Sequence, residues 1–295
     1  MSMLDVRYKQ IAKFIQKHGS VRDTRTGEVK CSFNTPNIFY DMRNGFSILT
    51  SKQVFMKGVC GELLWFLAGC DDLSSLRYKT FGVDEGQRTI WDDDFKRWNL
   101  ERGMEEASEC GGRIYGVQWR SSVGFSGEPV DQIKRLVEGI KRDPYSRYHI
   151  VQAWNPADIA QGLMALPPCH MMFQVDIDDG QWLDLKFYQR SVDLFLGEPY
   201  NLASYGLLMH ILGRLTGYKP RYLTAMFGNV QIYKDHTEQM ERLINNEHYD
   251  APKLILPDSF ETLEELEKLT AVDFGKFFPI YNNAGVIKAP LIVSK

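Results

Sequence analysis

Two stretches of the sequence are apolar on most sides of a helix, and they limit the possible folds more than any other feature. Residues 52–69 read KQVFMKGVCGELLWFLAG, and residues 201–218 read NLASYGLLMHILGRLTGY. A helix that is apolar around most of its circumference has to be covered by other elements. The sequence therefore predicts a large core with two central helices, and 295 residues are enough to build it.

Strand patterns lie between and after these helices. Residues 148–155 (YHIVQAWN), 170–177 (HMMFQVDI) and 181–191 (QWLDLKFYQRS) are expected to form strands, and the Asp-Asp-Gly sequence before the third predicts a tight hairpin turn. Further strands are expected at 222–233, 253–256 and 287–293. Because helices and strands are mixed without a regular βαβ rhythm, we expect an α+β fold rather than a doubly wound sheet.

The remaining segments complete a single predicted domain over residues 1–295. The N-terminus, MSMLDVRYKQIAKF, is typical of a short amphipathic helix, and residues 131–147 predict another that ends at an Asp-Pro pair. Residues 84–110 are charged and irregular, so we expect them to form a surface insertion. No Pro-, Gly- or Ser-rich stretch is long enough to link two domains.

Composition and charge argue against several classes of protein. The net charge of −3 gives no overall positive field that would favour nucleic acid or an anionic membrane. No apolar stretch reaches the roughly 18 residues that a membrane span needs, and the N-terminus lacks the apolar region of a signal peptide. Walker A and Gly-x-Gly-x-x-Gly loops are absent, so a bound phosphate would have to be held in another way.

The five cysteines are spread along the chain without a metal-binding pattern. No pair has Cys-x-x-Cys spacing and no histidine pair has helical metal-ligand spacing, so no metal site is expected. An odd number of cysteines in a long chain without a secretion signal favours free thiols in a reducing compartment. We therefore expect a cytoplasmic protein.

Cys169 follows two prolines at the start of an apolar run, in the sequence LMALPPCHMMFQVDI. Pro167 and Pro168 stiffen the backbone that delivers it, which suits a side chain that must be aimed. The alternative is a small buried hydrophobe, the commonest role of a free cysteine. His170 is not expected to be its base, because neighbouring residues on a strand point to opposite faces. Arg190 comes one hairpin later, where it is either a surface charge or a cation that stabilises the thiolate.

Two polar side chains in the apolar helices are further candidates. Asn201 could cap its helix, or its amide could bind uracil, which offers an N3–H donor beside an O4 acceptor, the reverse of cytosine. Glu62 lies in CGELLWFL, where burial would raise its pKa and make it a proton carrier near neutral pH. On the edge of the helix it would belong to a polar stripe instead. Arg25 and Arg147 are typical exposed arginines when each is taken alone.

Taken together, seven stretches of the chain resemble the motifs of the thymidylate synthase family. They are RTG, GELLWFLAG, TIWD, YGVQWR, ALPPCH, YQRSVDLFLGEPYNLASYGLL and GVIKAP. They occur in the order of the family and extend over nearly the whole chain, from about Thr24 to Pro290. The collinear order makes the resemblance very specific, and the block from Tyr188 to Leu208 is nearly diagnostic by itself.

The resemblance implies a thymidylate synthase-like fold, in which a large mixed β-sheet is flanked by helices and packs at the interface of a homodimer. It also implies a folate-dependent one-carbon transfer to C5 of dUMP. In this chemistry a thiolate, here that of Cys169, adds to C6 of the pyrimidine. C5 then becomes electron-rich and attacks the methylene of 5,10-methylenetetrahydrofolate. The stiff Pro-Pro approach would help to position the thiolate against the flat ring.

The resemblance also implies roles for individual residues. The catalytic residues it implies are Cys169, Glu62, Tyr115, Arg190, Asp193 and Asn201. The nucleotide-binding residues it implies are Arg25, Arg147, Gln189, Arg190, Ser191, Asn201, Gln231 and Tyr233, with Arg147 reaching the phosphate in the other subunit. The folate-binding residues it implies are Trp91, Leu166, Asp193, Gly197 and Tyr200. The C-terminal tail would close over the folate and exclude water.

The chain departs from the family pattern at several positions. Tyr148 replaces the second of two arginines, Gln231 replaces a histidine at the sugar, and Asn229 replaces an aspartate. Gln53 and Phe55 stand where a basic residue and a histidine are usual, and the tail APLIVSK extends beyond that of many relatives. These departures indicate a divergent member, either viral, and then active in the host cytoplasm, or with a modified product.

Three activities are compatible with these residues. The leading one is that of a thymidylate synthase, which gives dTMP and dihydrofolate. A deoxyuridylate hydroxymethyltransferase would share the covalent steps, but water would capture the methylene and tetrahydrofolate would leave. A non-catalytic descendant would only bind nucleotide or RNA, and the retention of Cys169, Glu62, Arg190 and Asn201 argues against it. Asn201 disfavours a cytidylate substrate.

Overall fold

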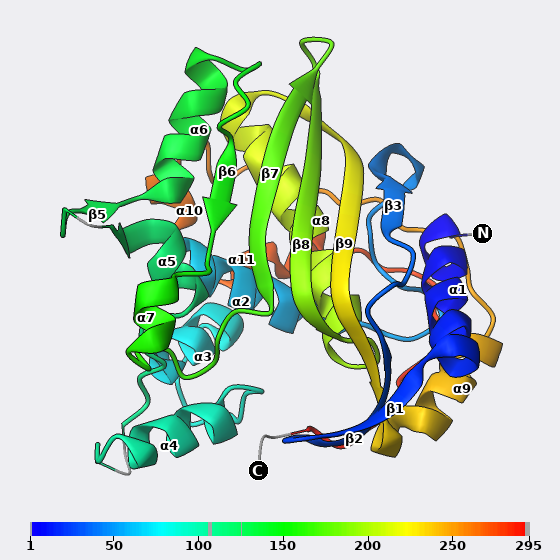
Figure 1. Cartoon of the computed structure of the whole chain (residues 1–295). Coiled ribbons are helices and arrows are strands. Elements are labelled where there is room, and N and C mark those ends of the chain that lie inside the picture. Colours follow the sequence, from blue (N-terminus) through cyan, green and yellow to red (C-terminus); the bar gives the residue numbers. More distant parts are fainter. Residues whose placement is uncertain (1, 106–107, 125, 293–295) are drawn as a thin grey trace.

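A mixed β-sheet forms the centre of the molecule (Figure 1), in a computed structural model that describes residues 2–105, 108–124 and 126–292. Among these residues its strands are β1 (Ser20–Thr24), β2 (Gly27–Ser32), β3 (Ile38–Asp41), β6 (Ile150–Gln152), β7 (His170–Asp178), β8 (Trp182–Asp193) and β9 (Lys219–Tyr233). The order is β1-β2-β9-β8-β7-β6, and β3 also pairs with β9. β8 and β9 are parallel and the other neighbours are antiparallel. The α+β fold with a large mixed sheet is confirmed.

Helices cover the back of this sheet and both of its edges (Figure 1). They are α1 (Met3–His18), α2 (Met56–Leu67), α3 (Leu73–Phe81), α4 (Asp92–Glu101), α5 (Tyr115–Ser121), α6 (Gln132–Arg142), α7 (Pro156–Ala160), α8 (Gly197–Thr216), α9 (Thr237–Asn245), α10 (Leu263–Leu266) and α11 (Ala271–Phe274). A small hairpin of β4 (Ser122–Val123) and β5 (Pro129–Val130) follows α5. No helix of the described segments is long and apolar enough to cross a membrane.

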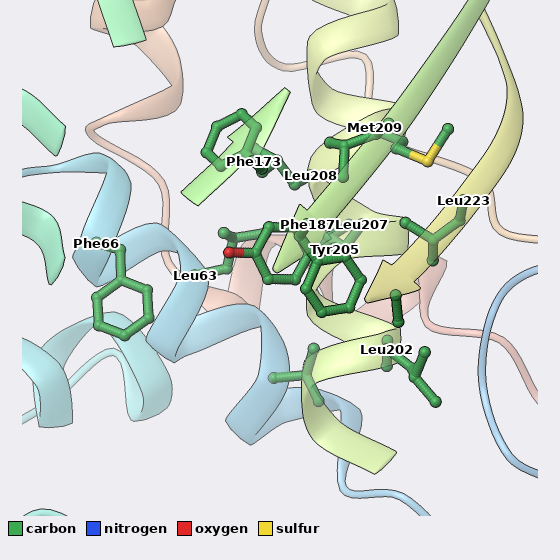
Figure 2. Packing of buried hydrophobic residues seen from close by; sticks show 14 of the residues in the cluster. Leu63, Phe66, Phe173, Phe187, Leu202, Tyr205, Leu207, Leu208, Met209 and Leu223 are labelled. Carbon is green, nitrogen blue, oxygen red and sulfur yellow. The ribbon is translucent and has the colours of Figure 1, made fainter. Parts of the chain in front are cut away.

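The two apolar helices of the sequence are α2 and α8, and both are buried as predicted. α8 connects the parallel strands β8 and β9, and α2 packs against α8 (Figure 2). The rings of Phe187 on β8 and Tyr205 on α8 stack with centroids 3.9 Å apart. α8 ends at Gly217, whose φ of 86° is the left-handed conformation that glycine adopts most easily. Nearly all of the buried apolar side chains of the described chain form one cluster, while a single domain over 1–295 stays a prediction.

The predicted hairpin joins β7 to β8. Asp179 and Gly180 have φ values of 50° and 61°, and two positive φ values in a row suit the twist of a tight hairpin. The helices predicted at the N-terminus and at 131–147 are also present, as α1 and α6. The strand predicted at 148–155 shortens to β6, three residues long.

Three expectations about local structure are wrong. Residues 253–256 form no strand, and neither do residues 287–292; Val293 lies outside the described residues. The residues just before these two segments bond to the loop before α2, where Phe46 N donates to Pro252 O at 2.7 Å and Gln53 N to Gly285 O at 2.8 Å. Residues 84–110 are not irregular throughout, because α4 forms within them and buries Phe95 completely. Residues 106–107 of that segment lie outside the described chain.

Candidate active site

Segments far apart in the sequence meet at one end of the central strands. β7 begins at His170 opposite Gln189 near the end of β8, and Asp193 of β8 lies level with Gln231 of β9. Tyr233, the last residue of β9, pairs with Val29 of β2, so the β1–β2 hairpin joins the same end. This is the lower end of the sheet in Figure 1. Most of the predicted site residues lie there.

Cys169 is held from two sides immediately before β7. Its backbone N–H donates to the Tyr115 hydroxyl at 2.7 Å, and its carbonyl accepts from the Arg190 N–H at 2.9 Å. The Arg190 side chain also fixes the two prolines, because Nε donates to Pro168 O at 2.9 Å and Nη2 to Pro167 O at 2.7 Å. The guanidinium therefore fastens the segment that delivers the thiol.

The electrostatic surroundings of the Cys169 thiol are mixed. Burial raises its pKa, and Asp193 adds to that rise, whereas the cations of Arg190 and Arg25 and a hydrogen bond from Tyr115 lower it. The structure thus brings four of the predicted site residues around this sulfur. A thiol in such a place is neutral at rest, and the two arginines reduce the free energy that its ionisation requires.

His170 does not face the same surroundings as Cys169. Its Nδ1 lies 2.9 Å from the Tyr205 hydroxyl, and its ring stacks on Tyr115 with centroids 4.2 Å apart. Burial lowers its pKa to about 3, so the imidazole is neutral near pH 7. The bond to Tyr205 agrees with the expectation that His170 is not the base of Cys169.

Glu62 projects from α2 into a cluster of aromatic side chains. Its Oε1 accepts from Trp91 Nε1 at 2.8 Å. Burial raises the pKa of Glu62 to about 7, although the Trp91 bond opposes the rise. Trp91 itself is 8% exposed and packs on Trp65 and Phe95. The carboxyl is therefore part of an aromatic cluster rather than of a polar stripe, and it can change protonation state near neutral pH.

Asp193 closes the turn between β8 and α8. Its Oδ1 accepts from the N–H groups of Phe195 at 2.9 Å and Leu196 at 3.0 Å. Burial raises its pKa, while those bonds and the nearby His236 and Lys52 lower it. A Cβ added to Gly197, the first residue of α8, would lie 3.5 Å from the Asp193 Cβ. This turn therefore fixes a buried carboxyl next to the start of the helix.

Asn201 is a recognition candidate rather than a helix cap. α8 begins at Gly197, so Asn201 lies a full turn inside it, and the interpretation as an N-cap is wrong. Its Nδ2 donates to Gln189 Oε1 at 2.6 Å. Gln189 is fully buried, and its Nε2 donates to Glu198. The Asn201 amide also hydrogen-bonds to Glu198, whereas its Oδ1 is not used in these contacts and is available to a ligand.

The nucleotide-binding candidates lie around the β1–β2 turn and the end of β9. Arg25 is exposed in that turn. Burial raises the pKa of Tyr233, Asp193 and Cys169 add to the rise, and a hydrogen bond to Thr26 and the charge of Arg25 oppose it. Ser191 Oγ accepts from Gln231 Nε2 at 3.3 Å. This end of the sheet therefore gathers the exposed cation of Arg25 and several hydroxyl and amide groups.

Two of the predicted folate residues, Leu166 and Tyr200, are half-buried. Leu166 packs against the core just before the Pro-Pro pair. Burial raises the pKa of Tyr200, and the nearby carboxyl of Glu62 adds to it, whereas a hydrogen bond with the Phe55 backbone lowers it. Trp91 lies deeper than expected for a residue that faces a ligand, because its indole bonds to Glu62.

Arg147 is the one predicted site residue that lies away from this end. Val175 N donates to His149 O at 2.9 Å, so the chain before β6 is level with Val175. Cys169 is separated from that level by six strand residues, roughly 20 Å at about 3.3 Å per residue. Arg147 is exposed there, beside Tyr148, which is 90% exposed. Within one chain, Arg147 does not join Cys169.

Two residues at the site had not been singled out from the sequence. Trp154 lies with its ring 5.4 Å from the Arg190 guanidinium, a cation–π contact that steadies this side chain. Glu198 is buried next to Gln189. Glu198 could have been noticed, because an acidic residue within an apolar helix is rarely buried without a partner. Among the described residues, no group of three or more metal-binding side chains comes together.

Comparison with known proteins agrees with this geometry. The family model described as thymidylate synthase matches residues 6–293. A probable thymidylate synthase of Escherichia phage T5 is 43% identical over 265 residues, which cover 90% of this chain and 92% of that protein. The thymidylate synthase of Enterobacteria phage T4 is 36% identical over 269 residues, 90% of this chain and 91% of that protein. The chain belongs to the thymidylate synthase family.

Proposed function

We propose that this protein is a thymidylate synthase that transfers a one-carbon unit from 5,10-methylenetetrahydrofolate to C5 of dUMP and releases dTMP and dihydrofolate. Its family makes it a one-carbon transferase acting on a deoxyuridine nucleotide. The observation that carries the detailed proposal is the position of Cys169, which is fixed by Tyr115 and Arg190 at the end of the sheet.

The reaction begins at the sulfur of Cys169. Once the thiol has lost its proton, Sγ bonds to C6 of the uracil and the C5–C6 electron pair moves toward C5 and O4. C5 then bonds to the methylene carbon as that carbon leaves the first of the two folate nitrogens that hold it, and C5 afterwards loses its own proton. The methylene separates from the folate nitrogen and is reduced by a hydride from the same folate, and the S–C6 bond breaks. Arg190 and Arg25 support the first step because both lower the pKa of Cys169.

Protons are carried by Glu62, with help from Tyr115. Burial raises the pKa of Glu62 to about 7, so this carboxyl can hold or release a proton at neutral pH. Burial raises the pKa of Tyr115 well above its usual value, which keeps its hydroxyl neutral. Asp193 is assigned to the folate side, where its bonds to the turn before α8 fix its position.

The nucleotide is held at both of its ends. Asn201 binds the uracil edge with its free Oδ1, and Gln189 orients it. The phosphate is bound by Arg25, Arg190 and Ser191, since arginine forks suit phosphate geometry. The remaining substrate and folate contacts are assigned to Gln231 and Tyr233 at the sugar and to Trp91, Leu166, Gly197 and Tyr200 at the folate. The tail residues Val293–Lys295, expected to close over the folate, lie outside the described residues.

A homodimer would complete the phosphate site. The outer face of the sheet, in front in Figure 1, carries exposed Phe39 on β3 and Ile150 on β6. A second copy packed there would cover these side chains and bring its Arg147 to the phosphate. The distance of Arg147 from Cys169 in its own chain supports this arrangement. The five free cysteines and the phage relatives support a cytoplasmic location, that of the host cell for a phage protein.

The test is to identify both products formed from dUMP and methylenetetrahydrofolate. Dihydrofolate together with dTMP is expected. Hydroxymethyl-dUMP with tetrahydrofolate would overturn the proposed product, although the covalent steps would stand. A second assay, with 5-fluoro-dUMP and methylenetetrahydrofolate, should give a ternary adduct on Cys169 by mass spectrometry. An unmodified Cys169 in that assay would mean that the protein binds nucleotide without this chemistry.

A further inference from the structure

The first turn of α8 carries a buried carboxyl group that the reaction steps above do not use. Glu198 is 0% exposed, and Gln189 donates to its Oε2. Its Oε1 is buried as well, without a partner among the described residues. A buried carboxyl with an unpaired oxygen costs free energy, so a compensating role should exist.

Glu198 is the end of a chain of hydrogen bonds that starts at Asn201. Asn201 Nδ2 donates to Gln189 Oε1 at 2.6 Å, and Gln189 Nε2 donates to Glu198 Oε2. Both hydrogen bonds therefore run in the same direction along the chain, from Asn201 toward the carboxyl group of Glu198. We call these three side chains the relay. Its members come from β8 and α8, which pack against each other.

We propose that Glu198 is a positioning residue that fixes the orientation of the Asn201 amide through Gln189, and so makes the site select uracil over cytosine. The inference rests on the proposed function, because it concerns the base that the same site binds. Glu198 itself need not touch the nucleotide.

The direction of the relay decides which base the Asn201 amide fits. With Nδ2 turned toward Gln189 and Glu198, Oδ1 is left to accept from uracil N3–H. Cytosine requires the amide to be turned over, which would place Oδ1 against Gln189 Oε1. Gln189 would then have to turn as well, and its oxygen would face Glu198. Two acceptors in contact repel each other, so the carboxylate opposes both rotations.

The surroundings of Glu198 agree with an accepting role. Burial raises its pKa to about 8, and the hydrogen bonds that Gln189 and Asn201 donate oppose this rise. The carboxyl is therefore mostly protonated near pH 7, and above about pH 8 it is ionised, so that it can accept but cannot donate. An amide in place of the carboxyl would have both a hydrogen-bond donor and an acceptor, and it could support either direction of the relay.

The test is Glu198→Gln. This substitution keeps the shape of the side chain, but it no longer fixes the direction of the hydrogen bonds in the relay. Above about pH 8, where Glu198 is ionised, kcat/KM for dUMP divided by kcat/KM for dCMP should fall at least about tenfold relative to wild type. The change should appear mainly in KM for dUMP, with kcat nearly retained. Tyr205→Phe is the matched control, because it removes a buried hydroxyl from the same helix outside the relay. It should leave the ratio of the two bases unchanged.

Two further measurements separate the possible failures. Glu198→Met removes the acceptor while filling the same space, and it replaces Glu198→Gln if that variant does not fold. Equilibrium titration with dUMP and with dCMP measures the preference without turnover. A folded variant that keeps the wild-type preference would overturn the role of Glu198. A wild-type protein that does not convert dUMP would instead overturn the proposed function, and the titrations would still test the relay.

Discussion

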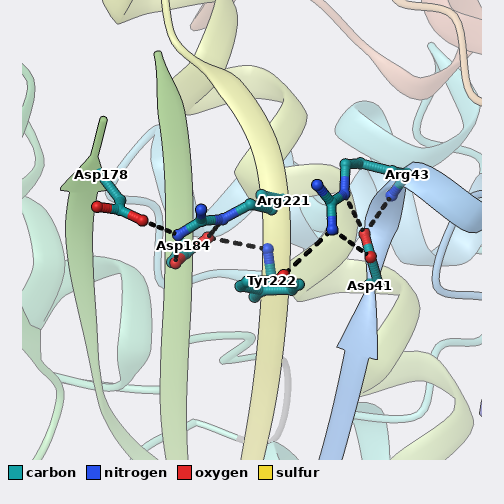
Figure 3. Close-up of polar contacts among 6 residues, drawn as sticks. All are labelled: Asp41, Arg43, Asp178, Asp184, Arg221 and Tyr222. Carbon is teal, nitrogen blue, oxygen red and sulfur yellow. Dashed lines mark hydrogen bonds and ion pairs between the residues drawn. The ribbon is translucent and has the colours of Figure 1, made fainter. Parts of the chain in front are cut away.

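Strand β8 carries two polar networks that face opposite sides of the sheet. On the outer side, Arg221 holds Asp184 through two bonds of 2.9 and 2.6 Å and also contacts Asp178 (Figure 3). On the inner side, five residues farther along the strand, Gln189 joins Asn201 to Glu198. Both networks fix side chains by hydrogen bonds, but only the outer one is open to water.

The difference in exposure gives the two networks different consequences. Asp178 is 54% exposed, and water can replace much of its contact with Arg221. Exposed ion pairs of this kind contribute about 0–1 kcal/mol. Gln189 and Glu198 are buried, so water cannot replace a lost partner there. Substitutions on the inner side and at the adjoining end of the sheet should therefore change the reaction, whereas those on the outer side should change only stability or association.

The largest effect is expected for Cys169→Ser. A serine hydroxyl is a far weaker nucleophile than a thiolate, so dUMP turnover should fall by roughly four orders of magnitude or more. The measurement is the initial rate of dihydrofolate formation, together with the melting temperature to show that the variant is folded. Cys70→Ser, at another half-buried cysteine beyond the end of α2, should retain most activity. Near-normal turnover of Cys169→Ser would rule out the covalent route.

The next effect is expected for Glu62→Gln, which removes the proton carrier but keeps its shape. Turnover should fall by roughly 10²–10⁴-fold, the range for loss of a general acid or base. Glu264→Gln, on the exposed side of α10, should be nearly silent. A wild-type rate in Glu62→Gln would remove Glu62 from the reaction.

The same variant has a predictable effect on stability. The pKa of Glu62 is raised to about 7 in the folded protein, above that of the unfolded chain. Its contribution to stability is therefore complete below about pH 4 and is lost as the pH rises through about 7, because the unfolded chain ionises first. Glu62→Gln should exceed wild type in melting temperature at about pH 8, and the difference should shrink toward about pH 5. A difference independent of pH would contradict the raised pKa.

A smaller change in turnover but a change in base preference is expected for Asn201→Asp. An aspartate in its protonated or ionised form presents a different set of donors and acceptors, and the ionised form suits the exocyclic amine of cytosine. The ratio of kcat/KM for dUMP to that for dCMP should fall by roughly 10²-fold. Unchanged selectivity would mean that Asn201 does not bind the base edge. A comparison with Glu198→Gln shows whether the relay and Asn201 both act on the choice between uracil and cytosine.

Much of the fold could be predicted because its strongest patterns are local. The two apolar helices, the hairpin at 178–180 and the amphipathic helix at 131–147 each depend on residues close in sequence. The strands predicted at 253–256 and 287–293 fail because short apolar runs do not distinguish a strand from an extended segment that bonds to a loop.

The residues of the site could be predicted from the sequence, but the hydrogen bonds between them could not. Cys169 and Glu62 are conspicuous because of the proline pair and the apolar surroundings. The bonds from Arg190 to the carbonyls of Pro167 and Pro168 could not be foreseen, because they join residues more than twenty positions apart through the strand register. Glu198 is conspicuous in the sequence as an acidic residue within an apolar helix, but its bond to Gln189 on another element could not be foreseen.

The smallest effect is expected on the outer side, for Asp178→Asn. Arg221 keeps both bonds to Asp184 in this variant, and Asp178 is exposed. The melting temperature should shift by less than about 2 °C, because a loss of up to about 1 kcal/mol moves a chain of this size by only a few degrees. The control is Asp184→Asn, which weakens the two bonds between Arg221 and Asp184. This control should shift the melting temperature more than Asp178→Asn does. A larger shift for Asp178→Asn at high protein concentration than at low would place the outer network inside the interface of the proposed homodimer, where the same ion pair is shielded from water.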